Sequence, residues 1–133
     1  MPLFPLVRDA ATAEFLDGCE RGDLLVVRDR TTGAYLDPKT DVSADPERFE
    51  RVAASGDATV ISWSIGHGRG ADGAPTRWTF GIVQLAEGPW FWSELQLPEG
   101  RAPEGLSGAS AHVAFVRTGP APEHATIPVF VVD

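Results

Sequence analysis

Short apolar segments separated by glycine- and proline-rich turns set the strongest limit on how this chain can fold. In the first of them, residues 58–65, the pattern alternates, with Ile61, Trp63 and Ile65 on one face. Such alternation is typical of a strand with one face toward a core. Four more segments follow, at residues 77–86, 90–97, 111–117 and 126–132. The second half of the chain is therefore expected to be built from strands.

The number and spacing of these segments favour one architecture. Five strands with a long connection before the fourth, over residues 98–110, fit a small Greek-key barrel of the OB type. Within the second segment, residues 78–82 keep one parity of large apolar side chains, and Val83 begins the opposite one. That switch predicts a bulge or bend after Gly81. Residues 66–76 are predicted to form a long glycine-rich loop.

The first part of the chain has a different pattern. A helix capped by Asp9 or Thr12 is expected to run to about Arg21, with Gly22 in the stop position. A strand over residues 24–28, a turn and a short return strand over residues 34–36 predict a hairpin. Residues 37–45 read as irregular, and residues 46–54 as a weak helix or an extended connector. The predicted domains are residues 1–54 and residues 55–133.

Composition narrows the classes of function. The 133 residues carry a formal net charge of −8, which repels phosphate backbones and argues against general nucleic-acid binding. No apolar run reaches the roughly 20 residues of a membrane helix, and the N-terminus lacks the pattern of a signal peptide. We therefore expect a cytoplasmic protein that binds neither nucleic acid nor membrane.

Catalytic and metal-binding patterns are weak. Cys19, the only cysteine, lies in the predicted helix and is interpreted as a packed thiol. The histidines His67, His112 and His124 are scattered through the barrel segments, so no nucleophile has an evident base. We expect no catalytic residue and no tetrahedral zinc site. The acidic residues 29, 37, 41 and 45 read as solvated loop charges, with a weak hard-cation contact as the alternative.

Several features occur in the order and spacing of one known family, from Phe15 to Val132. The features are the F-L-x-G-x-x-x-G-x-L-L pattern from Phe15 to Leu25, Ser55-Gly56, His67, Trp78, Glu87-Gly88-Pro89 and Ile127-Pro128-Val129-Phe130. On these features the chain resembles the acyl-CoA-associated OB-fold family, domain-of-unknown-function family 35, in which a cysteine-clamped zinc ribbon precedes an OB barrel. The resemblance implies a mainly β fold, with an N-terminal helix and a degenerate zinc-ribbon hairpin before a five-stranded OB-type Greek-key barrel.

The resemblance also implies where a metal would lie. The family's two zinc pairs fall on Asp29 and Thr32 and on Asp41 and Ala44. Alanine has no ligand atom, and two aspartates alone do not make a closed structural zinc site. The zinc is therefore expected to be lost, with no cofactor in its place and with the hairpin held by pairing and packing.

Members of this family resemble accessory subunits of thiolase-like enzymes, aldolases and acyltransferases that act on acyl-CoA. The resemblance implies a non-catalytic subunit in a hetero-oligomer, with acyl-CoA as a ligand shared with the partner. One alternative is a small stand-alone enzyme or ligand-binding barrel. A less favoured alternative is an OB module for single-stranded nucleic acid.

Two groups of residues are candidate contacts. The segment Gly68–Gly73 matches G-x-G-x-x-G, but a strand rather than a helix follows it, so a hairpin loop is the favoured interpretation. Around it, His67, Arg69, Arg77 and Trp78 are the candidates for contact with CoA.

On the third strand, Trp90, Trp92 and Glu94 share one face and are the candidates for a protein interface. Packing of this face under the N-terminal helix and base stacking remain as alternatives.

Overall fold

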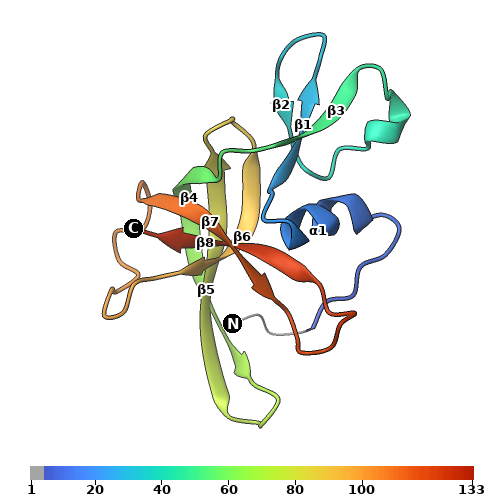
Figure 1. The fold of residues 1–133 in the computed structure, drawn as a ribbon. Helices are drawn as coiled ribbons and strands as arrows, with labels where there is room; N and C mark the ends of the chain where they lie inside the picture. The colour runs from blue at the N-terminus through green and yellow to red at the C-terminus, as the bar shows by residue number, and fades with distance from the viewer. Residues whose placement is uncertain (1–4) are drawn as a thin grey trace.

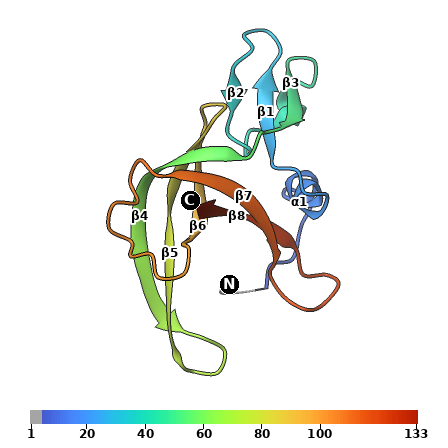
Figure 2. The ribbon, with the colours of Figure 1, turned by 60° about the vertical axis from the view of Figure 1, so that its left-hand side comes forward.

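The computed structural model describes residues 5–133 of the chain. It contains a small sheet, a barrel and one α-helix that lies between them (Figures 1 and 2). The first four residues of the predicted N-terminal domain lie outside the described residues. No helix in the described part of the chain is long and apolar enough to cross a membrane.

The barrel confirms the fold predicted from the sequence. Its strands close in the order β4-β5-β6-β8-β7, and every neighbouring pair is antiparallel except β6 and β8. One parallel pair in a closed ring of five strands is the Greek-key arrangement of an OB-type barrel. The strands are β4 (Asp57–Arg69), β5 (Pro75–Leu85), β6 (Trp90–Gln96), β7 (Ser110–Arg117) and β8 (Thr126–Val132).

The small sheet is larger than the predicted hairpin. It has the order β2-β1-β3, with β1 (Leu25–Asp29), β2 (Tyr35–Leu36) and β3 (Phe49–Ala53), and a 3-10 turn η1 (Val42–Ala44) before β3. Residues 46–54 are therefore not a helix: their second half pairs with the whole of β1. The charged side chains of this segment hid its strand character, because three of the five residues before Arg51 are ionisable.

The predicted glycine-rich loop is mostly a two-stranded arm. β4 continues through Gly66 and Gly68 to Arg69, which pairs with Pro75, so the loop shortens to residues 70–74. Figures 1 and 2 show this β4–β5 hairpin projecting away from the barrel, at the end opposite the β5–β6 turn. The prediction of a loop over residues 66–76 was wrong at both ends.

The predicted bulge exists but lies on the neighbouring strand. The register shifts between Val60 and Ser62 of β4, opposite Val83 and Ile82 of β5, while β5 itself runs on without interruption. The bulge turns Val60 and Trp63, which have opposite parity, toward the same core. A sequence pattern reveals a change in parity, but not which strand of a pair absorbs the extra residue.

Helix α1 (Ala13–Glu20) closes a gap in the barrel wall. β6 pairs with β8 only at Leu95 and Gln96, so the first half of β6 has no neighbour on that side. α1 lies over this gap, where the Phe15 ring meets the Phe91 ring at 6.1 Å between centroids. Phe91 in turn packs at 6.1 Å from Phe130, which is fully buried. The helix is thus part of the barrel's core.

Candidate functional site

The outward side of β5 and β6 forms an apolar surface, called here the aromatic face: Trp78, Phe80, Ile82, Trp90 and Trp92. Cross-strand partners in a sheet point to the same side, and Trp92 is the partner of Ile82. Trp90 and Trp92 are 55% and 63% exposed, while Val83 and Leu85 point inward and are buried. Helix α1 therefore leaves both tryptophans more than half exposed.

The neighbouring strand β4 keeps this face flat. On the same side it carries Ser62 and Ser64, both exposed, and then Gly66. The Trp78 ring lies over Gly66, where an added Cβ would come within 3.0 Å of the indole. The two glycines at 66 and 68 therefore serve packing: they let a large ring lie against the strand backbone.

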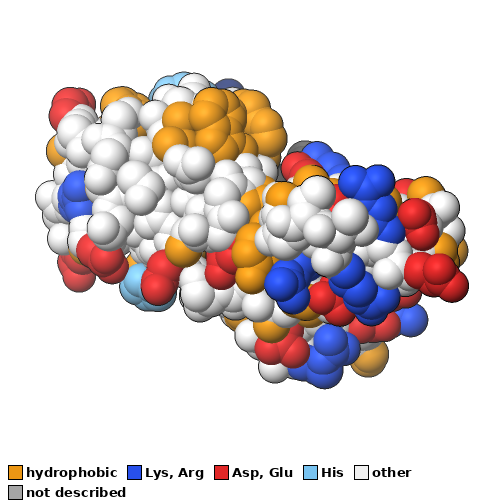
Figure 3. Space-filling model, turned by 90° about the horizontal axis from the view of Figure 1, so that it is seen from above, with side chains coloured by type: hydrophobic (Ala, Val, Ile, Leu, Met, Phe, Trp, Pro, Cys, Tyr) orange, Lys and Arg blue, Asp and Glu red, His pale blue; other side chains and the backbone are white. Residues whose placement is uncertain are grey.

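Charge is distributed unevenly over the molecule. Viewed from above, hydrophobic side chains gather on the barrel half, whereas acidic and basic side chains crowd the opposite end (Figure 3). The aromatic face has one charged neighbour on β6, Glu94, which is half-buried. A large apolar area with few charges on an acidic protein is typical of a protein interface.

The three basic candidates lie together, on the other side of the β4–β5 hairpin. His67 is the cross-strand partner of Arg77, and Arg69 follows two residues after His67 on the same side. All three are exposed. Trp78 has the opposite parity and belongs to the aromatic face, so the predicted group of four is divided between two surfaces.

The basic hairpin residues differ from most arginines of the chain. The structure pairs a large majority of the arginines with carboxylates, for example Arg48 with Asp29 at 2.9 Å. Within residues 5–133 no carboxylate lies within 4.0 Å of Arg69 or Arg77, and Arg69 donates instead to the Gly73 carbonyl at 2.9 Å. In the described part of the chain, the hairpin therefore presents two arginines without an ion-pair partner, and the Oδ1 of Asp72 at its tip accepts the Ala74 amide at 3.0 Å.

The positions expected for lost zinc ligands hold polar turns. Asp29 is buried, with its Oδ2 accepting from Arg48 and its Oδ1 from the Thr31 amide at 2.8 Å. These hydrogen bonds lower the pKa of Asp29 to about 2, and the one from Arg48 has the largest effect. Thr32 donates its amide to the same Oδ1 at 3.4 Å, which makes the turn a closed hydrogen-bonded unit.

The second predicted pair is also part of a turn. Asp41 accepts from the Ser43 amide at 3.0 Å and begins η1, in which Ala44 lies. Hydrogen bonds from Ser43 lower the pKa of Asp41. Across the described residues, no group of three or more His, Cys, Asp or Glu side chains is placed to hold a metal ion.

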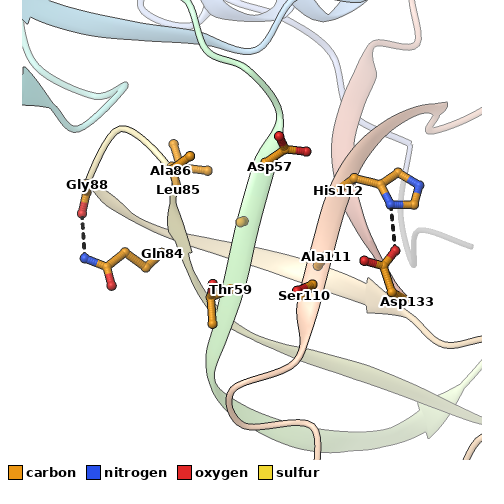
Figure 4. A pocket seen from close by; sticks show the side chains of 11 residues that line it. Asp57, Thr59, Gln84, Leu85, Ala86, Gly88, Ser110, Ala111, His112 and Asp133 are labelled. Atoms are coloured by element: carbon orange, nitrogen blue, oxygen red, sulfur yellow. Dashed lines mark hydrogen bonds and ion pairs between the residues drawn. The ribbon is translucent and has the colours of Figure 1, made fainter.

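A polar hollow of about 900 Å³ lies between β4, β7 and the end of β8 (Figure 4). His112 Nδ1 lies 3.2 Å from Asp133 Oδ1, and Figure 4 shows the imidazole turned toward Asp133. Ser110 lines the same hollow, but no hydrogen bond to His112 is recorded for its hydroxyl within the described residues. Nucleophilic catalysis needs that contact, so the hollow holds an oriented histidine without an aligned nucleophile.

Cys19 is buried in α1, with 1% of its surface exposed. Burial raises the pKa of the thiol to about 12. The thiolate is the reactive form of cysteine, so Cys19 is a packing residue, as the sequence indicated.

Sequence reasoning missed an apolar groove, called here the β6–β8 groove, beside the aromatic face. It lies between α1, the start of β6 and Ile127 of β8, and has a volume of about 310 Å³. Its rim includes Lys39, the chain's only lysine. In the sequence, Lys39 stands out only as a single lysine, which does not indicate a groove. Only the fold brings residue 39 beside the tryptophans.

Comparison with solved structures shows which fold this is. The chain matches a chain of the structure described as "Ltp2-ChsH2(DUF35) aldolase" with a TM-score of 0.71 and 20% identity, over 94% of this chain and 96% of that one. A second match is a DUF35 protein of unknown function from Sulfolobus solfataricus, with a TM-score of 0.57 and 16% identity, over 93% and 86% of the two chains. No protein-family model and no curated protein matches the chain.

Proposed function

We propose, from the fold that this chain shares with DUF35 proteins, that it is a non-catalytic accessory subunit of a thiolase-like acyl-CoA enzyme. The observation that carries the proposal is the aromatic face, in which Trp90 and Trp92 stay more than half exposed. Tryptophan is enriched among the residues that contribute most to binding between proteins. The match to a DUF35 chain in a structure described as an aldolase supports an enzyme as the partner.

The partner test is co-purification with the thiolase-like enzyme encoded beside this chain in its native host. We expect Trp92→Glu to abolish co-elution, because a charge would be buried in an apolar contact. Tyr35→Glu is the matched control: Tyr35 is an exposed aromatic residue on β2 of the small sheet. Equal co-elution of wild type and the Trp92 variant would refute the interface, and failure of any acyl-CoA enzyme to co-elute would refute the function.

The basic side of the hairpin has its own role in the proposal. His67, Arg69 and Arg77 contact the phosphates of a CoA that the partner enzyme holds, because phosphate groups favour uncompensated guanidinium donors. Trp78, on the other side of the hairpin, contributes to the aromatic face instead.

The test of the hairpin measures KM for acyl-CoA in the purified complex. Arg69→Ala and Arg77→Ala are each expected to raise KM by about two- to fivefold, the magnitude of an exposed ion pair. The increase should shrink at high salt, because salt screens exposed charges. Arg101→Ala, which removes a positive charge far from the hairpin in the sequence, is the control. An unchanged KM in both hairpin variants would remove the CoA contact and leave the protein interface unaffected.

A further inference from the structure

The β6–β8 groove is a consequence of incomplete strand pairing. The first half of β6 has no partner on its β8 side, and α1 covers that gap only in part. The remaining volume of about 310 Å³ falls at the lower end of the range for small-molecule pockets. At roughly 30 Å³ for a group the size of a water molecule, it holds about ten such groups.

The interior of the groove is apolar. Phe15 and Leu16 of α1 line one side, and Phe91 and Trp92 line the other. Ile127 of β8 closes the end. Leu16 is 3% exposed, and Phe15 and Phe91 pack against the core, so these three side chains are held in place by packing. Trp92 is 63% exposed and borders the open side of the groove. An occupant of the interior must therefore be apolar along most of its length.

Among residues 5–133, the rim carries one cation, Lys39, and one carboxylate, Asp37. Lys39 follows Pro38, which is buried, so the backbone position of the lysine is fixed by packing. Asp37, on the same rim, accepts the Lys39 backbone amide at 2.7 Å through its Oδ1. The nearby Glu14 is paired with Arg51 at 2.5 Å. Within the described residues, no carboxylate lies within 4.0 Å of the Lys39 ammonium, which leaves it to an external anion.

We propose that the β6–β8 groove binds a monocarboxylate with an unbranched apolar chain of about ten carbon atoms. The chain lies between α1 and the start of β6, and the carboxylate meets Lys39 at the rim. The proposal does not depend on the accessory function, because every residue that it uses comes from this chain. It assigns a ligand to a pocket whose walls are mostly aromatic and aliphatic side chains, as is typical of small-molecule sites.

The test is a titration of the full chain with decanoate below its micelle concentration, followed by the ¹H–¹⁵N signals of the indole groups. The chain has four tryptophans, so each indole gives one assignable signal. We expect Trp90 and Trp92 to shift with saturation, while Trp63 and Trp78 stay in place. Saturating shifts at Trp78 without shifts at Trp92 would overturn the site.

Variants separate the carboxylate contact from simple hydrophobic binding. Lys39→Gln should weaken decanoate binding by about five- to tenfold, as expected for the loss of a hydrogen bond to a charged group. Binding of decan-1-ol should not change in this variant. Arg28→Gln removes an equal charge from β1 of the small sheet and should leave decanoate binding unchanged. Equal affinities of Lys39→Gln and wild type for decanoate would overturn the proposal.

A blocking variant tests the volume of the groove itself. Ala11 lines the groove but is exposed, so Ala11→Phe fills space without entering the core. It should abolish the decanoate-dependent shifts while the remaining spectrum stays that of the folded protein. Retained decanoate binding in this folded variant would place the ligand elsewhere and refute the assignment.

Discussion

At the scale of single residues, the structure shows side chains whose role is set by one close neighbour. Gly81 of β5 is buried opposite Trp63 of β4, at the bulge. A Cβ at this position would lie well inside 3.0 Å of the Ser62 carbonyl oxygen, which is backbone and cannot rotate away. Gly68 differs, because a Cβ there would meet only side chains, the Trp78 ring at 3.3 Å and the Thr76 hydroxyl at 3.9 Å.

Gly81→Ala should therefore lower the free energy of unfolding by about 3 kcal/mol, the upper part of the range for overpacked cores. Gly68→Ala should cost less than about 1 kcal/mol, because an aromatic side chain can shift by a few tenths of an ångström. Urea unfolding of both variants measures the difference. Equal stabilities would contradict the close approach of β4 and β5 at the bulge.

The Asp29–Arg48 pair predicts how stability depends on pH. The pKa of Asp29 is lowered to about 2 in the folded chain, chiefly by the Arg48 hydrogen bonds. An unfolded aspartate titrates near pH 3.9. The ionised carboxylate thus stabilises the fold fully above about pH 4, and this contribution disappears as the pH falls toward 2.

Melting temperatures of wild type and Asp29→Asn, compared between pH 6 and pH 2, measure this contribution. The variant should melt lower at pH 6, and the gap should narrow as the pH falls. Asp23→Asn, which removes an exposed carboxylate 3.5 Å from Arg21, is the control and should show a small gap. A gap that widens in acid would contradict the assigned role of Asp29.

At the scale of elements, the sequence predicted the five barrel strands well because their apolar periodicity is strong. The helix was also placed well, since Gly22 has a positive φ of 83° that ends it. Two errors arose where the residue types are not typical of strands although the structure forms a strand there. Gly66 and Gly68 read as loop residues but accommodate the Trp78 ring within a strand. The charges around residue 50 masked β3, which is held by its pairing with β1.

The candidate site was predicted in part. The tryptophan pair on β6 and the basic residues near the hairpin were visible as local patterns. The separation of Trp78 from Arg77 also follows from strand parity, because neighbours in the predicted strand over residues 77–86 point to opposite faces. The β6–β8 groove was not predictable, because it depends on where β6 leaves β8 and on how α1 docks over the gap.

Cys19 offers a direct measure of how firmly α1 is docked. Its burial and its pKa of about 12 predict very slow reaction with a thiol reagent at pH 8 in the folded chain. Phe15→Ala should speed this reaction, because the variant loses the ring contact with Phe91. The absorbance of released thiolate from a disulfide reagent gives the rate. Immediate reaction of the native wild type would show that α1 is not packed as described.

At the scale of the whole molecule, the small sheet and the barrel share a core. Leu24 and Val26, before and within β1, belong to the same buried cluster as Val60 and Phe130 of the barrel. The division of the chain into domains of residues 1–54 and 55–133 stays a prediction. The shared cluster indicates that the second part depends on the first.

Residues 55–133 expressed alone should therefore lack a cooperative unfolding transition and bind a hydrophobic dye, because Phe91 loses its cover. In the full chain, Phe15→Ala should lower the free energy of unfolding by about 2–3 kcal/mol. This is at or below the lower limit for truncation of a buried phenylalanine, because Phe15 is only half-buried. Near-ultraviolet circular dichroism and urea titration provide the measurements. Native-like cooperativity of the fragment would show that the barrel is independent of α1.

Closure of the barrel also determines when the protein can fold during its synthesis. β4 is completed by β7, with Asp57 paired to His112, and the core beneath α1 is completed by Phe130. The ribosome makes α1, β1 and the tryptophan strands before it makes β7 and β8. Contacts so distant in sequence form slowly, and unpaired strand edges associate with other chains. The nascent chain therefore exposes its aromatic strands until β7 and β8 are made, and the native fold hides their edges only then.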